Sequence, residues 1–243
     1  MADRLPAVAA FWAERLGCPV SAFERPGLTL VPHPRRDAVY VLAAGDAVVA
    51  AAPEALRARL RAVPEPVALL APDTLSALLP PGTKLVGPAR IAYLHGALTS
   101  SSGVERLGSA SDPRLRELRA NITAQDWQYA NLEAAEPPLF GSSTGGRVAA
   151  AAGFERLLER VAHIGVVTDS RHRSLGLGRR VVQAAAAHAL EVGLLPQYQT
   201  LASNAPALRI AESLGFEPFA ITLAARFAGT VRSDEVVDEG GGE

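Results

Sequence analysis

The sequence predicts a mixed α/β (α+β) protein built from two parts. Short apolar, β-branched runs alternate along the chain with segments of helical periodicity, which indicates both strands and helices. A small, polar stretch at 97–113 indicates a linker or an exposed loop. It separates a smaller N-terminal α/β domain, 1–96, from a C-terminal domain, 114–230. The most regular unit lies in the second domain, where a strand, a glycine-rich turn and a helix follow one another from Val161 to Leu190.

The composition narrows the class of protein. The chain has 243 residues, of which 49% are hydrophobic, enough to bury one or two cores. A formal net charge of -1 gives no overall attraction to nucleic acid or to an anionic membrane. Cys18 is the only cysteine, so an intrachain disulfide is excluded and a cysteine-based metal site is not expected. No secretory signal or membrane-spanning run is evident, so we expect a cytoplasmic protein with no metal, no nucleic-acid partner and no membrane partner.

The N-terminal domain alternates helices and strands. The residue pattern predicts a helix over 5–16, a strand over 28–31, a hairpin over 39–50, and a helix from Pro53 to about Ala62. The segment from Lys84 to Tyr93 is predicted as strands broken near Gly87-Pro88, because proline cannot donate to a strand ladder. This domain contains no cluster of chemical groups that suggests a site.

The C-terminal domain begins with a strand predicted at Leu115–Leu118 and a helix after the capping residue Thr123. The remaining elements are predicted in this order: a hairpin over 139–152, a strand over 161–168, a helix over 177–191, a strand over 198–201, a helix from Asn204 to Gly215 and a strand or hairpin over 216–227. Residues 231–243 are acidic and end in glycines, so we expect a disordered tail.

The turn before the helix at 177–191 has the residues of a phosphate site. Gly176 and Gly178 open the helix, and arginines surround them. Free backbone N–H groups and the positive end of the helix dipole make such a place favourable for phosphate. The turn lacks the third glycine of a dinucleotide loop and the Gly-Lys-Ser/Thr of a P-loop. We therefore expect a phosphate-bearing ligand of another kind.

Three motifs together carry a resemblance to a known family. Arg173-x-x-Gly176-x-Gly178, then Asn204-x-x-Ala207, then Leu214-Gly215-Phe216 follow the order seen in the second half of the GNAT N-acetyltransferase superfamily. The close resemblance covers about 161–227, and a looser one extends back to Leu115. It implies a mixed, mostly antiparallel sheet with a V-shaped splay between strands 161–168 and 198–201. Some acyltransferases of this superfamily carry a second, degenerate copy in the position of 1–96.

The resemblance also implies that acetyl-CoA is the cosubstrate and which residues hold it. Strand backbone would bind the pantetheine arm, loop N–H groups would bind the pyrophosphate, and arginines would add positive charge. These cofactor-binding residues are Val166, Val167, Thr168, Arg171, Arg173, Ser174, Leu175, Gly176, Leu177, Gly178, Arg179 and Asn204.

The reaction that the resemblance implies is direct attack of a primary amine on the thioester. An alkylamine with a pKa near ~10.4 needs a base at neutral pH. His163 is a candidate, although strand alternation places it opposite Ala162 and Ile164, so a structural histidine is the alternative. Many relatives use a tyrosine as acid seven residues after the asparagine, where this chain has Ala211. Tyr198 is the other catalytic candidate, with its direction unknown.

Two functions stay open at this point. The first is an N-acetyltransferase acting on a small-molecule or protein amine, and the second is a catalytically weak or inactive acyl-CoA-binding module with a regulatory role. Glu133 and Glu136 could line an amine site or lie on the surface, and Trp127 and Tyr129 could line a pocket or pack in the core. The acceptor cannot be named from the sequence, and a homodimer stays open.

Overall fold

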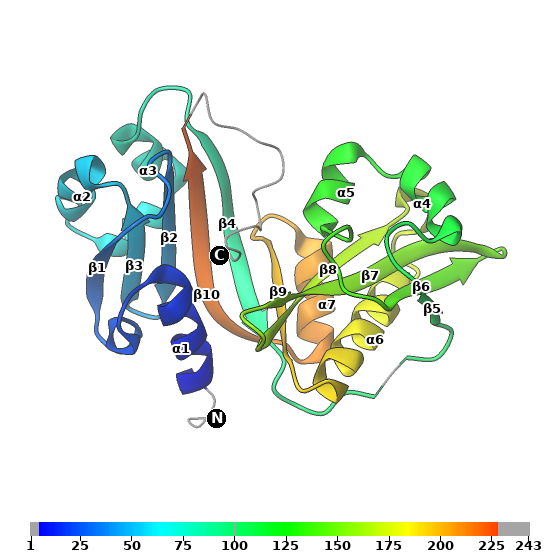
Figure 1. Ribbon diagram of the computed structural model, residues 1–243. Helices are drawn as coiled ribbons and strands as arrows, with labels where there is room; N and C mark the ends of the chain where they lie inside the picture. The colour runs from blue at the N-terminus through cyan, green and yellow to red at the C-terminus, as the bar shows by residue number, and fades with distance from the viewer. Residues whose placement is uncertain (1–4, 100, 228–243) are drawn as a thin grey trace. The chain divides into compact units, whose positions relative to one another are not determined.

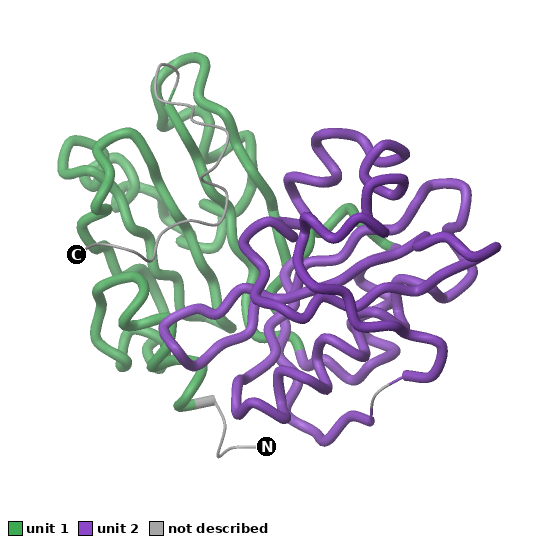
Figure 2. Tube along the Cα trace, turned by 45° about the vertical axis from the view of Figure 1, so that its right-hand side comes forward, with its two compact units in different colours: residues 1–91, 200–205, 218–233 green, residues 92–199, 206–217, 234–243 purple. Residues whose placement is uncertain are grey.

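The computed structural model describes residues 5–99 and 101–227 (Figure 1). Contacts between residues divide the chain into two compact units, which Figure 2 shows in different colours. Unit 1 takes its described residues from 1–91, 200–205 and 218–233, and unit 2 takes them from 92–199 and 206–217. Among the described residues, no helix has both the length and the apolar character that a membrane crossing requires.

Unit 1 is a strongly apolar sheet with helices packed on both of its faces. Its elements are α1 (Leu5–Leu16), β1 (Gly27–Pro32), β2 (Ala38–Ala44), β3 (Ala47–Ala52), α2 (Glu54–Arg61), α3 (Pro72–Leu78), most of β4 (Lys84–Tyr93) and β10 (Glu217–Arg226). The strand order is β1-β3-β2-β10-β4. β3 is buried along its whole length because α2 and α3 cover one face, and α1 lies against the other through stacking of Trp12 on Tyr40.

Unit 2 is a sheet with helices on both faces. Its elements are β5 (Glu105–Leu107), α4 (Arg116–Asn121), α5 (Ala124–Ala130), β6 (Leu139–Thr144), β7 (Arg147–Leu157), β8 (Val161–Thr168), α6 (Leu177–Glu191), β9 (Leu195–Leu201) and α7 (Ala205–Leu214). The order is β9-β8-β7-β6-β5, antiparallel from β5 to β8 and parallel between β8 and β9. This arrangement confirms the predicted mixed, mostly antiparallel sheet.

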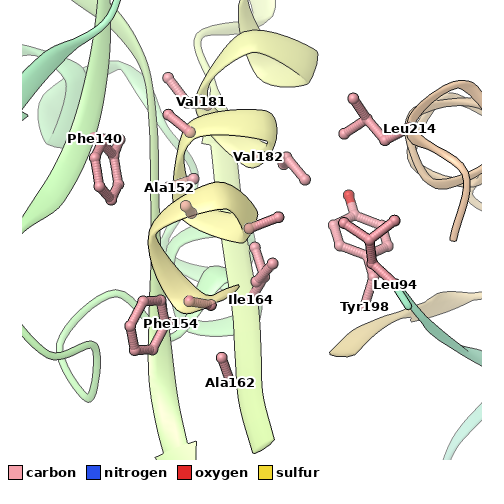
Figure 3. Close-up of a cluster of buried hydrophobic side chains, with 14 of the residues drawn as sticks. Leu94, Phe140, Ala152, Phe154, Ala162, Ile164, Val181, Val182, Tyr198 and Leu214 are labelled. Atoms are coloured by element: carbon pink, nitrogen blue, oxygen red, sulfur yellow. The ribbon is translucent and has the colours of Figure 1, made fainter. Parts of the chain in front are cut away.

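α6 packs on β6 to β8 through small side chains. Alanines at 184–187 and 189 are all buried, so the helix axis can lie close to the sheet. Val181 and Val182 lie among the buried side chains of this core in Figure 3, and each is fully buried. α4 and α5 cover the opposite face around Trp127 (Figure 1). The two faces of the sheet therefore have separate hydrophobic cores, one under α6 and one under α4 and α5.

α7 ends in the way that its sequence predicts. Gly215 has a φ of +81°, and its N–H donates to the Glu212 carbonyl. The next N–H, from Phe216, donates to the Ala211 carbonyl. This pair of bonds is a Schellman motif, which satisfies carbonyls at the helix end and favours glycine at the left-handed position.

The predicted strand at Leu115–Leu118 is wrong, because these residues begin a short turn and helix α4. The Asp112 carboxylate accepts the backbone N–H of Arg114 and so caps the turn. Leu115, Leu118 and Ile122 are buried on one side of the following helix. Their spacing of three and four residues is helical, and a four-residue window is too short to reveal it.

The predicted break at Gly87-Pro88 is also wrong, because β4 is continuous through a cis Gly87–Pro88 peptide bond. Proline loses its donor but keeps its acceptor, and the Pro88 carbonyl accepts the N–H of Ala202. Gly87 has a φ of +120°, and a Cβ there would lie 2.9 Å from the Thr222 carbonyl oxygen. Glycine is therefore required where β10 approaches the strand.

The compact units differ from the predicted division in two segments. β5 forms inside the predicted linker 97–113 and pairs with β6. β10 falls in unit 1, since its residues from Ile221 to Arg226 pair with β2. The predicted tail at 231–243 lies outside the described residues.

Candidate active site

β8 and β9 part at one end of unit 2. They pair in parallel from Val161↔Leu195 to Ile164↔Tyr198, and no ladder pair joins the rest of these two strands, all of which are described. On the other side, β8 stays paired with β7 as far as Thr168. The strands therefore open into the V that the sequence predicts.

The ladder shows which backbone groups of β8 face this opening. The Asp169 N–H donates to the Ala149 carbonyl of β7. Backbone groups alternate sides along a strand, so those of Val167 also face β7. The N–H and C=O groups of Val166 and Thr168 face the side on which β9 has moved away. Two of the three predicted pantetheine-binding residues are thus oriented toward the opening.

The loop between β8 and α6 presents a row of backbone donors. Ser174 and Gly176 have φ values of +66° and +75°, which turn the chain into α6. No N–H group from Ser174 to Arg179 donates a hydrogen bond to any acceptor in the described chain, and the first helical bond is that of Arg180 to Gly176. α6 has 15 residues, so its dipole adds to these donors. A pyrophosphate fits this row by charge and by hydrogen bonding.

Gly178 lets the first turn of α6 approach β8. A Cβ at this position would lie 2.9 Å from Thr168 Oγ1 and 3.4 Å from Ile210 Cδ1. The neighbouring Leu177 is buried and anchors the helix start in the core. Leu175 instead is exposed at the loop tip. The two glycines therefore have different roles. Gly176 forms the turn, and Gly178 permits α6 to pack closely on β8.

Three arginines near the loop have different partners. Arg171 makes a bidentate ion pair with Asp169, with Nη2 2.7 Å from Oδ2. This guanidinium holds the pKa of the buried Asp169 carboxyl far below its usual range. Arg173 forms an ion pair with Asp126 of α5, with Nη2 3.6 Å from Oδ2. Arg179 turns away from the loop and donates to the hydroxyl and carbonyl of Ser213 at the end of α7, so only its backbone belongs to the donor row.

His163 lies in a chain of polar side chains on the α5 face of the sheet. Its Nδ1 is 2.8 Å from Gln197 Oε1 on β9, and Gln197 Nε2 donates to the Tyr93 hydroxyl at 2.5 Å. Gln197 and Tyr93 are buried. On the other side, Glu155 of β7 is the cross-strand partner of His163 and accepts a hydrogen bond from Asn131. His163 therefore has oriented polar neighbours from both adjacent strands.

The end of α5 lies directly over β8 beside His163. A Cβ at Gly165 would overlap the carbonyl oxygen of Ala130, the last residue of α5. Asn131 follows in a left-handed conformation, with a φ of +46°, and directs its amide to Glu155. Gly165 thus fixes how closely the α5 segment can approach the histidine.

Tyr198 lies on the opposite face of the sheet from His163. Gln197 shares the His163 face, so the next residue points the other way. Tyr198 is buried in the α6 and α7 core and packs against Phe216, and in Figure 3 its hydroxyl points toward Leu214. Burial raises its pKa above the ordinary tyrosine value. The structure does not bring the two predicted catalytic side chains together.

The remaining predicted residues have ordinary structural contacts. Glu133 accepts a hydrogen bond from Trp127, which is buried, and Glu136 is paired with Arg156. Tyr129 is exposed, and Asn204 directly precedes α7. Ala211, in the place where many relatives have tyrosine, is buried in the same core as Tyr198.

Sequence reasoning missed Tyr93, Glu155 and Gln197. Strand alternation could have placed Glu155 on the face of His163 once the β7–β8 register was assumed. No local signal joins Tyr93 to Gln197, because 104 positions separate them in the chain. Among the described residues, no group of three or more histidine, cysteine, aspartate or glutamate side chains could hold a metal ion.

A parallel strand pair that opens beside a helix-start row of N–H groups is the arrangement that the resemblance to GNAT acetyltransferases implies. Residues 105–216 match the model of the Acetyltransferase (GNAT) family. The family uses acetyl-CoA as its cosubstrate. The match includes β5 to α7, and so contains the opening, the loop and His163.

Several solved structures are similar to this chain. A putative GNAT acetyltransferase from Novosphingobium aromaticivorans is 28% identical over 62% of this chain and 70% of its own, with a TM-score of 0.48. An acetyltransferase from Colwellia psychrerythraea is 20% identical over 59% of this chain and 57% of its own, with a TM-score of 0.46. A putative acetyltransferase from Salmonella typhimurium, solved with acetyl-CoA, is 18% identical over 40% and 69%, with a TM-score of 0.32. No curated protein matches the chain.

Proposed function

We propose that the protein transfers an acetyl group from acetyl-CoA to a primary amine, by direct attack of the amine on the thioester. The observation that carries this proposal is the place of His163, one residue before the last paired position of β8 and β9. This position, where the strands begin to open, supports a role for His163 as the base. The acceptor would be a small-molecule or a protein amine.

Acetyl-CoA supplies the activated acetyl group, and this chain supplies its binding surface. Val166 and Thr168 offer backbone N–H and C=O groups to the amides of the pantetheine arm. The N–H groups from Ser174 to Arg179 bind the pyrophosphate, with Arg171 and Arg173 adding charge beside them. One strand N–H facing the opening can also polarise the thioester carbonyl.

His163 is the proposed base. An alkylamine is mostly protonated at neutral pH, since its pKa lies near ~10.4, whereas an ordinary histidine titrates near ~6.5. Proton transfer from the free ammonium to an imidazole is therefore uphill, and the neutral imidazole takes the proton as the amine attacks the thioester, when the nitrogen becomes far more acidic, directly or through one water. Gln197 orients the ring through Nδ1. Nε2 is then the ring atom that takes the proton.

The departing thiolate leaves without a tyrosine acid in this proposal. An ordinary thiol has a pKa of about 8.5, and an ordinary tyrosine has one of about 10. Burial moves the pKa of Tyr198 higher still, so proton transfer from its hydroxyl to the thiolate is uphill. Tyr198 can donate a hydrogen bond, but its main contribution is to the core that supports α7.

A second function is favoured by one observation. Ala211 occupies the place of the usual acid and is buried against other apolar side chains. A domain that binds acyl-CoA with weak or no turnover, and acts in regulation, would carry the same loop without needing that hydroxyl. The two functions differ in product formation and agree in CoA binding.

The experiment that separates the two functions combines binding and turnover. Calorimetry measures the affinity for CoA, and a thiol-release assay with acetyl-CoA is run over a panel of diamines, amino sugars, amino acids and peptide N-termini. We expect CoA binding together with amine-dependent thiol release. CoA binding with no release above background for the whole panel would favour the binding module. Absence of CoA binding would contradict both functions.

A further inference from the structure

We propose that Gln197 is a positioning residue that holds His163 as the Nδ1–H tautomer, and that Tyr93 fixes the orientation of the Gln197 amide. The function of this arrangement rests on the proposed acetyl transfer. The tautomer itself is a property of the free protein, so it can be tested separately. Neither Gln197 nor Tyr93 touches the reacting groups in this proposal.

The three side chains are held in one line by the sheet. His163 and Gln197 are ladder partners in the parallel pairing of β8 with β9, so their side chains leave the same face. Tyr93 ends β4, and the N–H of the next residue, Leu94, donates to the Pro196 carbonyl just before Gln197. Backbone pairing therefore sets the spacing of the side chains before their hydrogen bonds form.

The amide of Gln197 has one donor end and one acceptor end. In the structure its Nε2 donates to the Tyr93 hydroxyl and its Oε1 faces His163 Nδ1. An amide oxygen can only accept, and therefore Nδ1 must carry the proton. In a neutral imidazole the other nitrogen, Nε2, then carries the lone pair. This is the nitrogen that the proposed chemistry requires as base.

Burial makes the arrangement rigid. Tyr93 is 0% exposed and Gln197 is 1% exposed, so water does not compete for the bond between them. Loss of the Tyr93 hydroxyl would leave the amide NH₂ buried without this acceptor, which costs free energy and permits the amide to turn. The amide is neutral, so it orients the ring without adding a charge beside it.

The direct test is a long-range ¹H–¹⁵N NMR spectrum of the histidine rings in the full chain. The spectrum distinguishes protonated from unprotonated ring nitrogens, and a His163→Gln sample identifies the His163 signals. At about pH 8, above the ordinary histidine pKa of ~6.5, we expect protonated Nδ1 and unprotonated Nε2. A protonated Nε2 in the unaltered protein overturns the proposal.

Three variants connect the tautomer to its cause. Gln197→Met removes the acceptor at similar volume and should convert the His163 signals to a tautomer mixture. Tyr93→Phe should do the same to a smaller extent, while Gln197→Glu keeps an acceptor and should preserve Nδ1–H. Gln128→Met, at an exposed position on α5, is the matched control. Unchanged His163 signals in both Gln197→Met and Tyr93→Phe overturn the proposal.

Kinetics provides the second readout. Gln197→Met should lower kcat about tenfold, at the modest end of base effects, and leave the KM for acetyl-CoA within about twofold. If no acetyl transfer is found for the unaltered protein, the proposed function fails and the NMR result still decides the tautomer. If transfer is found but the variants retain the parent tautomer, only the positioning role fails. Circular dichroism shows whether Gln197→Met folds. If it does not, the spectra of Gln197→Glu and Tyr93→Phe decide the proposal.

Discussion

At the scale of single residues, His163 has oriented partners on both sides of its strand, Gln197 on β9 and Glu155 on β7. His163→Ala should lower kcat by about 10²–10⁴, the usual contribution of a general base, with little change in the affinity for CoA. Steady-state rates and calorimetry measure the two quantities. An unaltered kcat would show that the histidine is structural.

Tyr198 provides a contrasting prediction. An ordinary tyrosine is already a weaker acid than a thiol, and burial raises the pKa of Tyr198 further, so its hydroxyl is a poor proton donor at neutral pH. Tyr198→Phe should therefore keep kcat within about threefold of the parent, since the buried ring is retained. A loss of 10² or more would identify this tyrosine as the missing acid.

Asp169 gives a prediction about pH. Its pKa is lowered in the folded protein by Arg171, so the pair contributes stability above the ordinary aspartate pKa of ~3.9. This contribution is lost as the pH falls through the folded-state pKa, which lies below that value. Asp169→Asn should therefore unfold at a lower temperature than the parent at pH 7. Thermal unfolding at a series of pH values should show this difference shrinking below about pH 4, and a difference that grows on acidification would contradict the assigned role.

At the scale of helices and strands, the contact between α6 and β8 depends on Gly178. Glycine-to-alanine changes in helices ordinarily stabilise by ~0.5–1 kcal/mol, but here a Cβ would press on Thr168 Oγ1. Gly178→Ala should shift the start of α6 and weaken CoA binding about tenfold by calorimetry, because displaced N–H donors lose alignment. Gly96→Ala, where a Cβ meets nothing within 4 Å, is the matched control. Equal affinities for CoA in Gly178→Ala and Gly96→Ala would show that the close packing at Gly178 does not align the N–H donors.

The fit of α5 on β8 depends in the same way on Gly165. A Cβ there would overlap the Ala130 carbonyl, and backbone cannot move aside as a flexible side chain can. Gly165→Ala should lower the free energy of unfolding by about 1–3 kcal/mol, the usual cost of overpacking. Denaturant unfolding measures this, with Gly96→Ala again as control. A stability equal to that of the parent would mean that α5 can lift from the strand at no cost.

Local signals predicted the elements from β8 to β10 well. The start of α6 at Gly176 and the end of α7 at Gly215 were readable because each depends on a glycine in a left-handed conformation. Leu115–Leu118 was misread because the helical period appears only when Ile122 is included. The break at Pro88 was mispredicted because proline has no N–H to donate, although its carbonyl still accepts a hydrogen bond from Ala202 in the sheet.

At the scale of the whole molecule, the site combines a part that one segment encodes with a part that pairing assembles. The loop between β8 and α6 lies within a single run of sequence, so its turn and its row of backbone donors could be predicted from its glycines. The chain from Tyr93 through Gln197 to His163 joins three strands, so it required the register of the sheet. Strand alternation alone correctly placed His163 opposite Ile164, and it could not show that Gln197 would be its partner.

The rate of thiol release from acetyl-CoA tests the proposed acetyl transfer most directly. Thiol release from acetyl-CoA by the unaltered chain should depend on an added primary amine, with acetylated amine found by mass spectrometry in equal amount. His163→Gln should bind CoA as tightly and release thiol about 10²-fold more slowly. Release that is independent of every amine tested, or equal in the two proteins, would contradict the proposed reaction and the role of the histidine in it.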